Sequence, residues 1–233
     1  MKRPVRVVLI DSGVHASHPH VNGVAGGIGI DSAGDLHGDY VDRLGHGTAI
    51  AAVVREKAPA AEILIAKVFD RELAATGTAL VAACEWALGQ RADLVNLSLG
   101  TTNPLHAMPL ADVVARLRAS GAAVIAAGSQ DGVAWLPGTL PGVWSVTLDW
   151  SLPRDQCRVV AMADDDVSFQ AAGYPRPIQG VPPERNLKGL SFAVANVTGL
   201  LAALPDRPDA ESPAAALLRA LADERLGPIG RSR

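Results

Sequence analysis

Short apolar runs that end in aspartate, serine or glycine constrain the fold of this chain more than any other feature. The first covers residues 5–10 and ends at Asp11-Ser12-Gly13. Similar runs follow at residues 63–68, 93–98, 122–127 and 143–147. Continuous runs of this length, rich in β-branched residues, are typical of strands buried on both faces of a parallel sheet.

Segments with helical periodicity separate or follow these runs, at residues 78–88, 111–120, 191–204 and 213–224. The alternation of strands and helices predicts an α/β domain with a mainly parallel sheet. The chain has 233 residues, of which 48% are hydrophobic and 19% charged, which is enough to bury one sizeable core. We therefore expect a single domain over residues 1–233, with its core at about 5–204. A C-terminal helix at 213–224 precedes a tail at 227–233 that we expect to fray.

Two stretches between these segments are rich in residues that favour turns. Residues 23–29 are rich in glycine and residues 175–183 in proline, so both are predicted to be loops. The glycine-rich stretch lacks the lysine and the following helix of a phosphate-binding loop. Nucleotide binding is therefore not expected.

Charge and hydropathy exclude several other classes of protein. The formal net charge is −3 and no basic block interleaved with aromatic residues occurs, so no nucleic-acid or anionic-membrane partner is indicated. The first apolar run stops at Asp11, which is too short for a secretory signal, and no run reaches the length of a membrane span. These observations predict a soluble cytoplasmic protein; its oligomeric state is not indicated.

None of the clusters of possible metal ligands in the sequence is expected to bind a metal. Cys84 and Cys157 lack ligand spacing and are predicted to be buried thiols of a protein in a reducing compartment. A group of histidines lies near the N-terminus, at His15, His18 and His20. No cysteine or carboxylate completes a ligand set there, and the acidic residues 164–166 are typical of a solvated turn.

Chemistry is expected where the parallel strands end, because ligands of open α/β sheets bind at the carboxyl ends of the strands. Asp11, Gly100 and Gly128 follow three of the predicted strands. Three short segments stand out: DSGV at 11–14, GHGT at 45–48 and GLSFA at 189–193. They supply a carboxylate, an imidazole and a hydroxyl in the order Asp, His, Ser, which is the chain order of the subtilisin triad.

With these motifs the chain resembles the subtilisin-like serine proteases, the subtilase family, from about residue 7 to 204. The resemblance lies in VLIDSGV at 8–14, HGT at 46–48, DLVNLSLG at 93–100 and GLSFA at 189–193. It implies a three-layer subtilisin-like α/β fold, with a mainly parallel central sheet flanked by helices. It also implies a serine endopeptidase that uses no cofactor.

The resemblance assigns a role to each group of the triad. Ser191, at the start of a helix, would be the nucleophile, and His46 would accept its proton as general base. Asp11 would hold the imidazole and stabilise its charged form. Peptide bonds would then be hydrolysed through a covalent acyl-enzyme.

The resemblance also implies where a peptide or unfolded protein segment would bind as substrate. Ser98, Leu99 and Gly100 would pair with an extended peptide through backbone hydrogen bonds. The walls of the pocket for the residue before the scissile bond would be Ser98 to Gly100 on one side and Ala126, Ala127 and Gly128 on the other. Trp135 would either fill the floor of that pocket, which favours small residues, or pack outward beneath Pro137.

One departure from the family pattern concerns the oxyanion site. Ser129 stands where most relatives have an asparagine whose amide binds the oxyanion, and Gln130 follows it. Removing one such donor in a member of this family lowers kcat by about 10²–10³-fold. Ser129 or Gln130 could supply a substitute donor, and the backbone N–H of Ser191 is expected to remain.

Two further departures bear on regulation. The segment 53–59 is short, so no calcium loop is expected there, and the chain begins at its first core strand, so we expect no inhibitory pro-domain. A protease without that restraint needs another, which suggests restricted processing of a substrate such as a leader-bearing precursor peptide. The alternatives are a catalytically impaired peptide-binding pseudoprotease, and an acyl-transfer ligase or cyclase that passes the acyl group to an amine.

Overall fold

The computed structural model describes residues 3–163 and 166–204. The strands are β1 (Arg6–Asp11), β2 (Gly26–Ile30), β3 (Leu36–His37), β4 (Glu62–Lys67), β5 (Leu94–Leu97), β6 (Ala123–Ala127), β7 (Ser129–Gln130), β8 (Val133–Ala134), β9 (Val143–Leu148), β10 (Cys157–Ala163) and β11 (Asp166–Ala171). The helices are α1 (His46–Lys57), α2 (Gly77–Gly89), α3 (Ala107–Ala119) and α4 (Leu190–Ala202), with 3₁₀ turns at Pro104–His106 and Pro183–Arg185. The helix predicted at 213–224 and the tail at 227–233 lie outside the described residues.

Most of these strands join in a single sheet. Within the described residues the strand order is β10-β11-β9-β6-β5-β1-β4-β2-β3. Adjacent strands are parallel from β11 to β2, and the two edge strands β10 and β3 are antiparallel to their neighbours. Strand β1 lies between β4 and β5, so the order in which strands are added along the chain changes direction at β1. This change of direction places a crevice at the carboxyl ends of β1 and β5.

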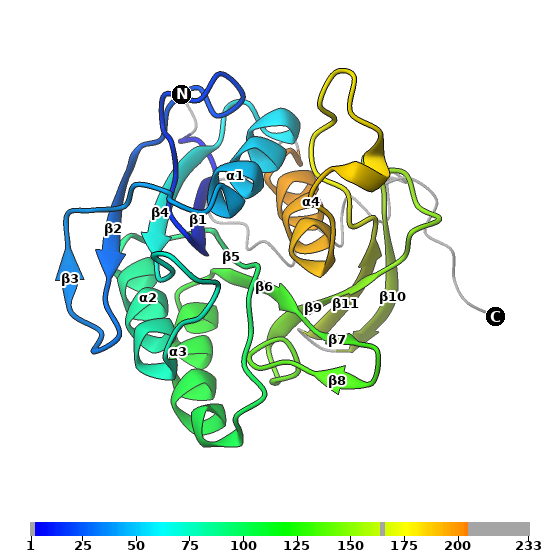
Figure 1. Cartoon of the computed structure of the whole chain (residues 1–233). Helices are drawn as coiled ribbons and strands as arrows, with labels where there is room; N and C mark the ends of the chain where they lie inside the picture. Colours follow the sequence, from blue (N-terminus) through cyan, green and yellow to red (C-terminus); the bar gives the residue numbers. More distant parts are fainter. Residues whose placement is uncertain (1–2, 164–165, 205–233) are drawn as a thin grey trace.

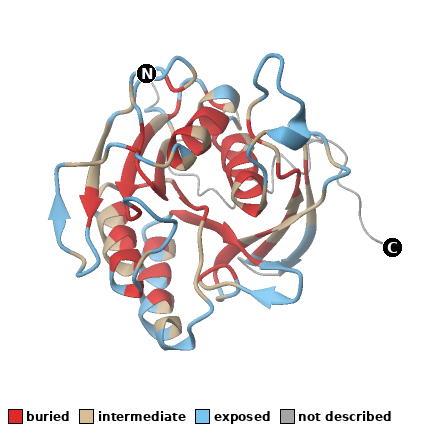
Figure 2. Ribbon diagram, viewed as in Figure 1, coloured by how far each residue is buried: buried red, intermediate tan, exposed pale blue. Residues whose placement is uncertain are grey.

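Helices cover both faces of the sheet, as Figure 1 shows. Helices α1 and α4 pack together on one face, and α2 and α3 pack on the other. The burial colours in Figure 2 place the buried residues in the central strands and on the helix surfaces that face them. The predicted three-layer α/β fold is confirmed.

The first strand shows why its sequence is continuously apolar. Val7 and Leu9 point into the core beneath α1 and α4, whereas Val8 and Ile10 point into the core beneath α2 and α3. Because side chains alternate between the two faces, a strand covered on both needs apolar residues at every position.

The prediction of a loop at residues 23–29 is wrong for its second half. Gly26–Ile30 forms β2, which pairs in parallel with β4. The glycines let two side chains approach the strand closely. A Cβ on Gly29 would lie 2.0 Å from the ring of His37, and one on Gly27 would lie 2.7 Å from the ring of Tyr40. Close approach of neighbouring groups, and not a turn, explains these glycines.

Two helices also differ from expectation. Helix α1 was not predicted, although its first residue, His46, belongs to one of the motifs that the sequence singled out. The helix predicted at 111–120 is α3, which begins four residues earlier, at Ala107. A 3₁₀ turn leads into it, and the side chain of Asn103 caps this turn by accepting a hydrogen bond from the Leu105 N–H at 3.0 Å.

Other expectations agree with the structure. Of the loop predicted at residues 175–183, residues 175–182 contain no helix or strand, and a 3₁₀ turn begins at Pro183. Cys84 and Cys157 are buried, free thiols. Burial raises the pKa of each to about 12, so both behave as apolar core residues. In the described part of the chain, no helix is both long and apolar enough to cross a bilayer.

Candidate active site

Asp11 is the last residue of β1 and lies in the crevice at the carboxyl end of the sheet. Only 1% of its surface is exposed. Its Oδ1 atom accepts a hydrogen bond from the backbone N–H of Ser12 at 2.7 Å. The same oxygen lies 2.7 Å from Nδ1 of His46, so the carboxylate and the imidazole meet as the sequence predicted.

His46 is the first residue of α1, which brings its ring to the end of β1. Burial of the ring opposes its protonation. The hydrogen bond that the imidazole donates to Asp11 and the charges of Asp11 and Asp42 outweigh that effect, so the pKa of His46 lies above its ordinary value. The ring of Phe192 lies 5.5 Å from the imidazole, centroid to centroid, and covers it from the side of α4. The imidazole is therefore held from two sides.

Ser191 is in the first turn of α4, where backbone N–H groups have no partner within the helix. Its hydroxyl donates a hydrogen bond to the carbonyl oxygen of Ser98 at 2.8 Å. The Ser98 hydroxyl in turn donates to Oδ1 of Asn96 at 2.8 Å and contacts the carbonyl oxygen of Ser191 at 3.1 Å. These bonds tie the start of α4 to the segment that follows β5.

His46 and Ser191 line the same cavity, which has a volume of about 300 Å³. Its other walls come from the segment after β5, the loop before α2 and the first turn of α2. They are mostly apolar or backbone: Phe69, Leu73, Ala74, Ala75, Leu80, Ser98, Leu99, Gly100 and Thr101. His46 and Ser191 thus line one cavity, and Asp11 is linked to it through its contact with His46.

The predicted substrate segments lie on either side of a short connection at residues 135–136. Ser98, Leu99 and Gly100 follow β5, while Ala126 and Ala127 end β6 and Gly128 follows it. The N–H of Trp135 donates to the carbonyl oxygen of Gly128 at 2.8 Å. A Cβ on Gly100 would lie 2.9 Å from Cβ of Trp135. Trp135 therefore contacts both segments, and it packs, partly buried, against the core beneath α1 and α4.

The segment that departs from the family pattern forms a hairpin. Ser129 and Gln130 are β7, which pairs with β8 across a tight turn where Asp131 and Gly132 have positive φ. Both residues are exposed. The side-chain amide of Gln130 donates to the carboxylate of Asp131 at 3.2 Å, so it is already engaged. Because the amide has a second N–H, Ser129 and Gln130 both remain candidates to replace the missing asparagine.

Sequence reasoning missed one residue of this region, Asp42. It is buried in the loop before α1, with 1% of its surface exposed. Burial opposes ionisation of its carboxylate, but hydrogen bonds from Thr48, Leu44 and Ser12 outweigh this and lower its pKa. An aspartate shortly before a helix is a cap signal, and that signal could have singled it out.

Possible metal ligands are dispersed. Among residues 3–163 and 166–204, no group of three or more His, Cys, Asp or Glu side chains could hold a metal ion. His18 and His20 contact each other edge to face, with ring centroids 5.1 Å apart. Their geometry is that of a surface pair.

Comparison with known proteins identifies the family of the chain. The family model of the subtilase family matches residues 2–152. The chain is 30% identical over 181 residues to the minor extracellular protease Epr of Bacillus subtilis strain 168, which covers 72% of this chain and 27% of Epr. It is 27% identical over 209 residues to subtilisin E of the same strain, which covers 84% of this chain and 52% of subtilisin E. The chain thus spans about half or less of these relatives.

Solved structures show the same fold. The prenylagaramide maturation protease PagA superposes with a TM-score of 0.63 at 23% identity, covering 87% of this chain and 75% of PagA. A lanthipeptide protease superposes with a TM-score of 0.63 at 19% identity, covering 86% and 72%. The fold and the site define a subtilisin-like α/β protein. The chain belongs to the subtilase family.

Proposed function

We propose that the chain is a serine endopeptidase in which Asp11, His46 and Ser191 form the catalytic triad. One observation carries the proposal: the imidazole of His46 is bound to a buried carboxylate and shares a cavity with a serine at a helix N-terminus. Such a set activates a hydroxyl for attack on a carbonyl carbon.

The first half of the reaction forms the acyl-enzyme. The Ser191 hydroxyl turns from the Ser98 carbonyl towards Nε2 of His46, which takes its proton as Oγ attacks the peptide carbonyl. The charge on the imidazole is stabilised by Asp11. Collapse of the tetrahedral intermediate breaks the C–N bond, and the leaving amine takes the proton from His46.

The second half returns the enzyme to its starting state. Water attacks the acyl carbon and gives its proton to His46, and the ester bond to Ser191 breaks as that proton returns to Oγ. In both halves the oxyanion is bound by the backbone N–H of Ser191, with the field of the α4 N-terminus behind it. The Ser129 hydroxyl is the second donor, a shorter and weaker replacement for an asparagine amide.

The substrate we propose is a segment of a precursor peptide, cut at a restricted set of positions. The two structural neighbours are described as a prenylagaramide maturation protease and a lanthipeptide protease, which supports this choice by analogy. A weak oxyanion site and Trp135 between Gly100 and Gly128 both favour restricted cleavage. Small residues before the scissile bond are expected.

A peptide-binding pseudoprotease is the second candidate. The observation that favours it is the hydrogen bond from Ser191 Oγ to the Ser98 carbonyl, which engages the proton that His46 would have to accept, together with Ser129 at the oxyanion position. In this case peptides would bind to the segment after β5 but no acyl-enzyme would form.

Active-site labelling separates the two candidates. The protein is incubated with a biotinylated fluorophosphonate, in which Ser191 Oγ displaces fluoride from phosphorus, and the mass of the intact protein is measured. We expect one adduct in the wild type and none in Ser191→Ala. A folded wild-type protein that forms no adduct over long incubation contradicts the protease proposal and favours the pseudoprotease.

Product masses distinguish hydrolysis from ligation. A peptide that is cut by the wild type gives fragments whose summed mass exceeds the substrate by one water if the acyl-enzyme is hydrolysed. A product joined to an added amine lacks that water. We expect hydrolysis.

A further inference from the structure

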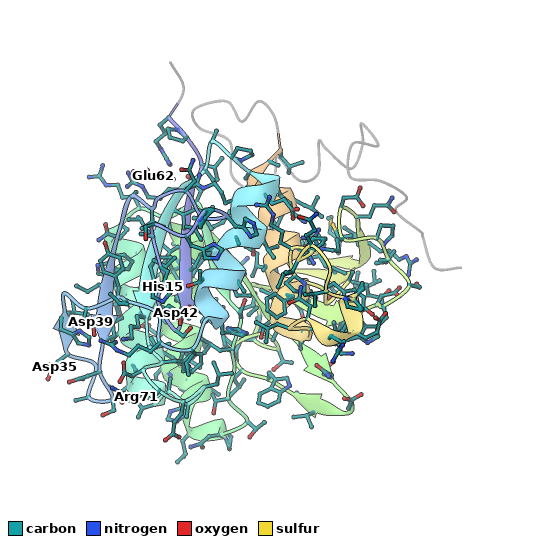
Figure 3. The ribbon with its side chains drawn as sticks, turned by 45° about the horizontal axis from the view of Figure 1, so that its top comes forward. His15, Asp35, Asp39, Asp42, Glu62 and Arg71 are labelled. Atoms are coloured by element: carbon teal, nitrogen blue, oxygen red, sulfur yellow. The ribbon has the colours of Figure 1, made fainter. Side chains whose placement is uncertain are left out.

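Asp42 is a buried carboxylate that neither touches the cavity nor belongs to the triad motifs. It lies in the loop that leads into α1, beside His15 in the view of Figure 3. A buried carboxylate is unfavourable unless hydrogen bonds compensate for lost hydration. Its environment therefore indicates what it is for.

Both oxygens of this carboxylate accept hydrogen bonds from N–H and O–H groups. Its Oδ1 accepts from the Ser12 hydroxyl at 2.8 Å and from the backbone N–H groups of Leu44 and Gly45 at 2.9 Å. Its Oδ2 accepts from the backbone N–H and the hydroxyl of Thr48, at 2.9 and 2.6 Å. Both oxygens must be acceptors, so an asparagine would turn an NH₂ group towards a donor.

The first oxygen controls the hydroxyl of Ser12. Because that hydroxyl gives its proton to Asp42, its lone pairs are free to accept the Gly47 N–H, at 2.9 Å. Ser12 follows Asp11 and Gly47 follows His46. The bond between Ser12 and Gly47 therefore joins the two segments a second time, beside the 2.7 Å contact between Asp11 and His46.

The second oxygen controls Thr48 in the same way. The Thr48 hydroxyl donates to Asp42 and accepts from the backbone N–H of His15 at 3.0 Å. This joins the loop after β1 to the first turn of α1 a second time. Through Ser12 and Thr48, one carboxylate fixes the segment that carries Asp11 against the helix that carries His46.

We propose that Asp42 is a positioning residue: it sets the distance and angle between Asp11 and His46 without touching the substrate. This inference rests on the proposed function, because it concerns the geometry of the same triad. A misplacement of reacting groups by about 1 Å can lower a rate by about 10²-fold.

The charge of Asp42 gives the proposal a signature that a purely structural role lacks. The charged groups that act on His46 are Asp11, from the end of β1, and Asp42, from the loop before α1; both oppose the effect of burial and raise the pKa of His46. His46 must be neutral to act as a base. Removing the Asp42 charge therefore shifts the acid limb of the pH profile to lower pH.

The rate of fluorophosphonate labelling tests the proposal without a known substrate. We compare wild type with Asp42→Asn, Thr48→Val and Thr48→Ser, measuring the maximal labelling rate, the half-saturating probe concentration and the pH dependence. Asp93→Asn is the matched control. Asp93 accepts hydrogen bonds from Arg3 and from the Arg6 N–H, at the opposite end of the sheet from the site.

We expect Asp42→Asn to lower the maximal rate about 10–100-fold, to leave the half-saturating concentration within about twofold, and to move the acid-limb midpoint to lower pH. Thr48→Val lowers the rate about tenfold, whereas Thr48→Ser keeps the hydroxyl and the wild-type rate. Asp93→Asn labels like the wild type.

Two results overturn the proposal. One is a folded Asp42→Asn protein that labels at the wild-type rate with an unshifted pH midpoint. The other, which decides the matter if Asp42→Asn does not fold, is equal labelling of Thr48→Val and Thr48→Ser. Absence of labelling in the wild type has a different meaning, since it contradicts the triad and not the role of Asp42.

Discussion

Gly47 lies so close to Gly13 that a Cβ on residue 47 would stand 2.2 Å from the Gly13 carbonyl oxygen. The same Cβ would lie 3.1 Å from Oδ1 of Asp11. The first turn of α1 thus rests directly on the turn after β1. This contact leaves no room for a side chain and sets how near His46 comes to the aspartate.

Gly47→Ala is therefore expected to push α1 away from β1. We predict a labelling rate at Ser191 lower by about 10²-fold and a free energy of unfolding lower by about 1–3 kcal/mol. Labelling kinetics and thermal denaturation measure the two effects. Gly38→Ala is the matched control, because a Cβ there has no neighbour within 4 Å. Similar losses in both variants would argue against this explanation.

Asp11→Asn tests the carboxylate itself. Without its charge the imidazole loses the partner that fixes its tautomer and stabilises its protonated form, so we predict a labelling rate lower by about 10³–10⁴-fold. The hydrogen bond and charge of Asp11 raise the pKa of His46, so their loss lowers it. The residual labelling should reach its plateau at lower pH than in the wild type. An unchanged pH midpoint would contradict the assigned pairing.

Trp135→Ala tests the preference for small residues before the scissile bond. The side chain contacts Gly100, and its backbone binds Gly128, so its removal enlarges the space between the two substrate segments. We predict that peptides with alanine before the cleaved bond are preferred by the wild type. The variant should gain about tenfold or more in kcat/KM for phenylalanine over alanine. A matched peptide series read by mass spectrometry measures this ratio, and an unchanged ratio would place the indole elsewhere.

Lys57 carries a destabilising charge. Burial and the nearby charge of Arg154 lower its pKa from 10.5 to about 8, against the opposing effect of Glu56 and Asp155. Its side chain is only 7% exposed and packs over Gly199 of α4. Lys57→Met keeps the packing and removes the charge, so we predict an increase in stability of about 1–3 kcal/mol at pH 7.

The effect of the Lys57 charge on stability depends on pH, because protonation and folding are linked. Between pH 8 and 10.5 the unfolded chain binds more protons at this site than the folded one, so wild-type stability gains from a rise in pH. The advantage of Lys57→Met is thus complete below pH 8 and disappears towards pH 10.5. Melting temperatures of both proteins at pH 7, 9 and 10 measure it. A constant difference would show that packing, not charge, is responsible.

Much of the site could be predicted from sequence because local patterns encode it. Asp11 ends an apolar run, His46 follows a glycine, and Ser191 opens a helix, so each motif is readable on its own. Their convergence also follows from topology, since parallel strands end at one edge. The orientation of the Ser191 hydroxyl towards Ser98 was not predictable, because it depends on contacts between α4 and the segment after β5.

The elements that were missed owe their form to packing between distant segments. Strand β2 is rich in glycine, a composition that favours a loop. Its glycines are explained by the close approach of His37 and Tyr40. Asp42 was missed for a similar reason: its donors include Ser12, thirty positions away in sequence. Local propensity does not encode such partners.

The order of the three motif residues along the chain has a consequence for the timing of activity during synthesis. Asp11 and His46 are made early, but Ser191 is carried by α4, the last element of the described fold, which must dock beside α1. Contacts between such distant parts of a chain carry a loop-closure cost and form slowly. On the proposed function, a nascent chain therefore holds the acid and the base without the nucleophile until α4 has docked.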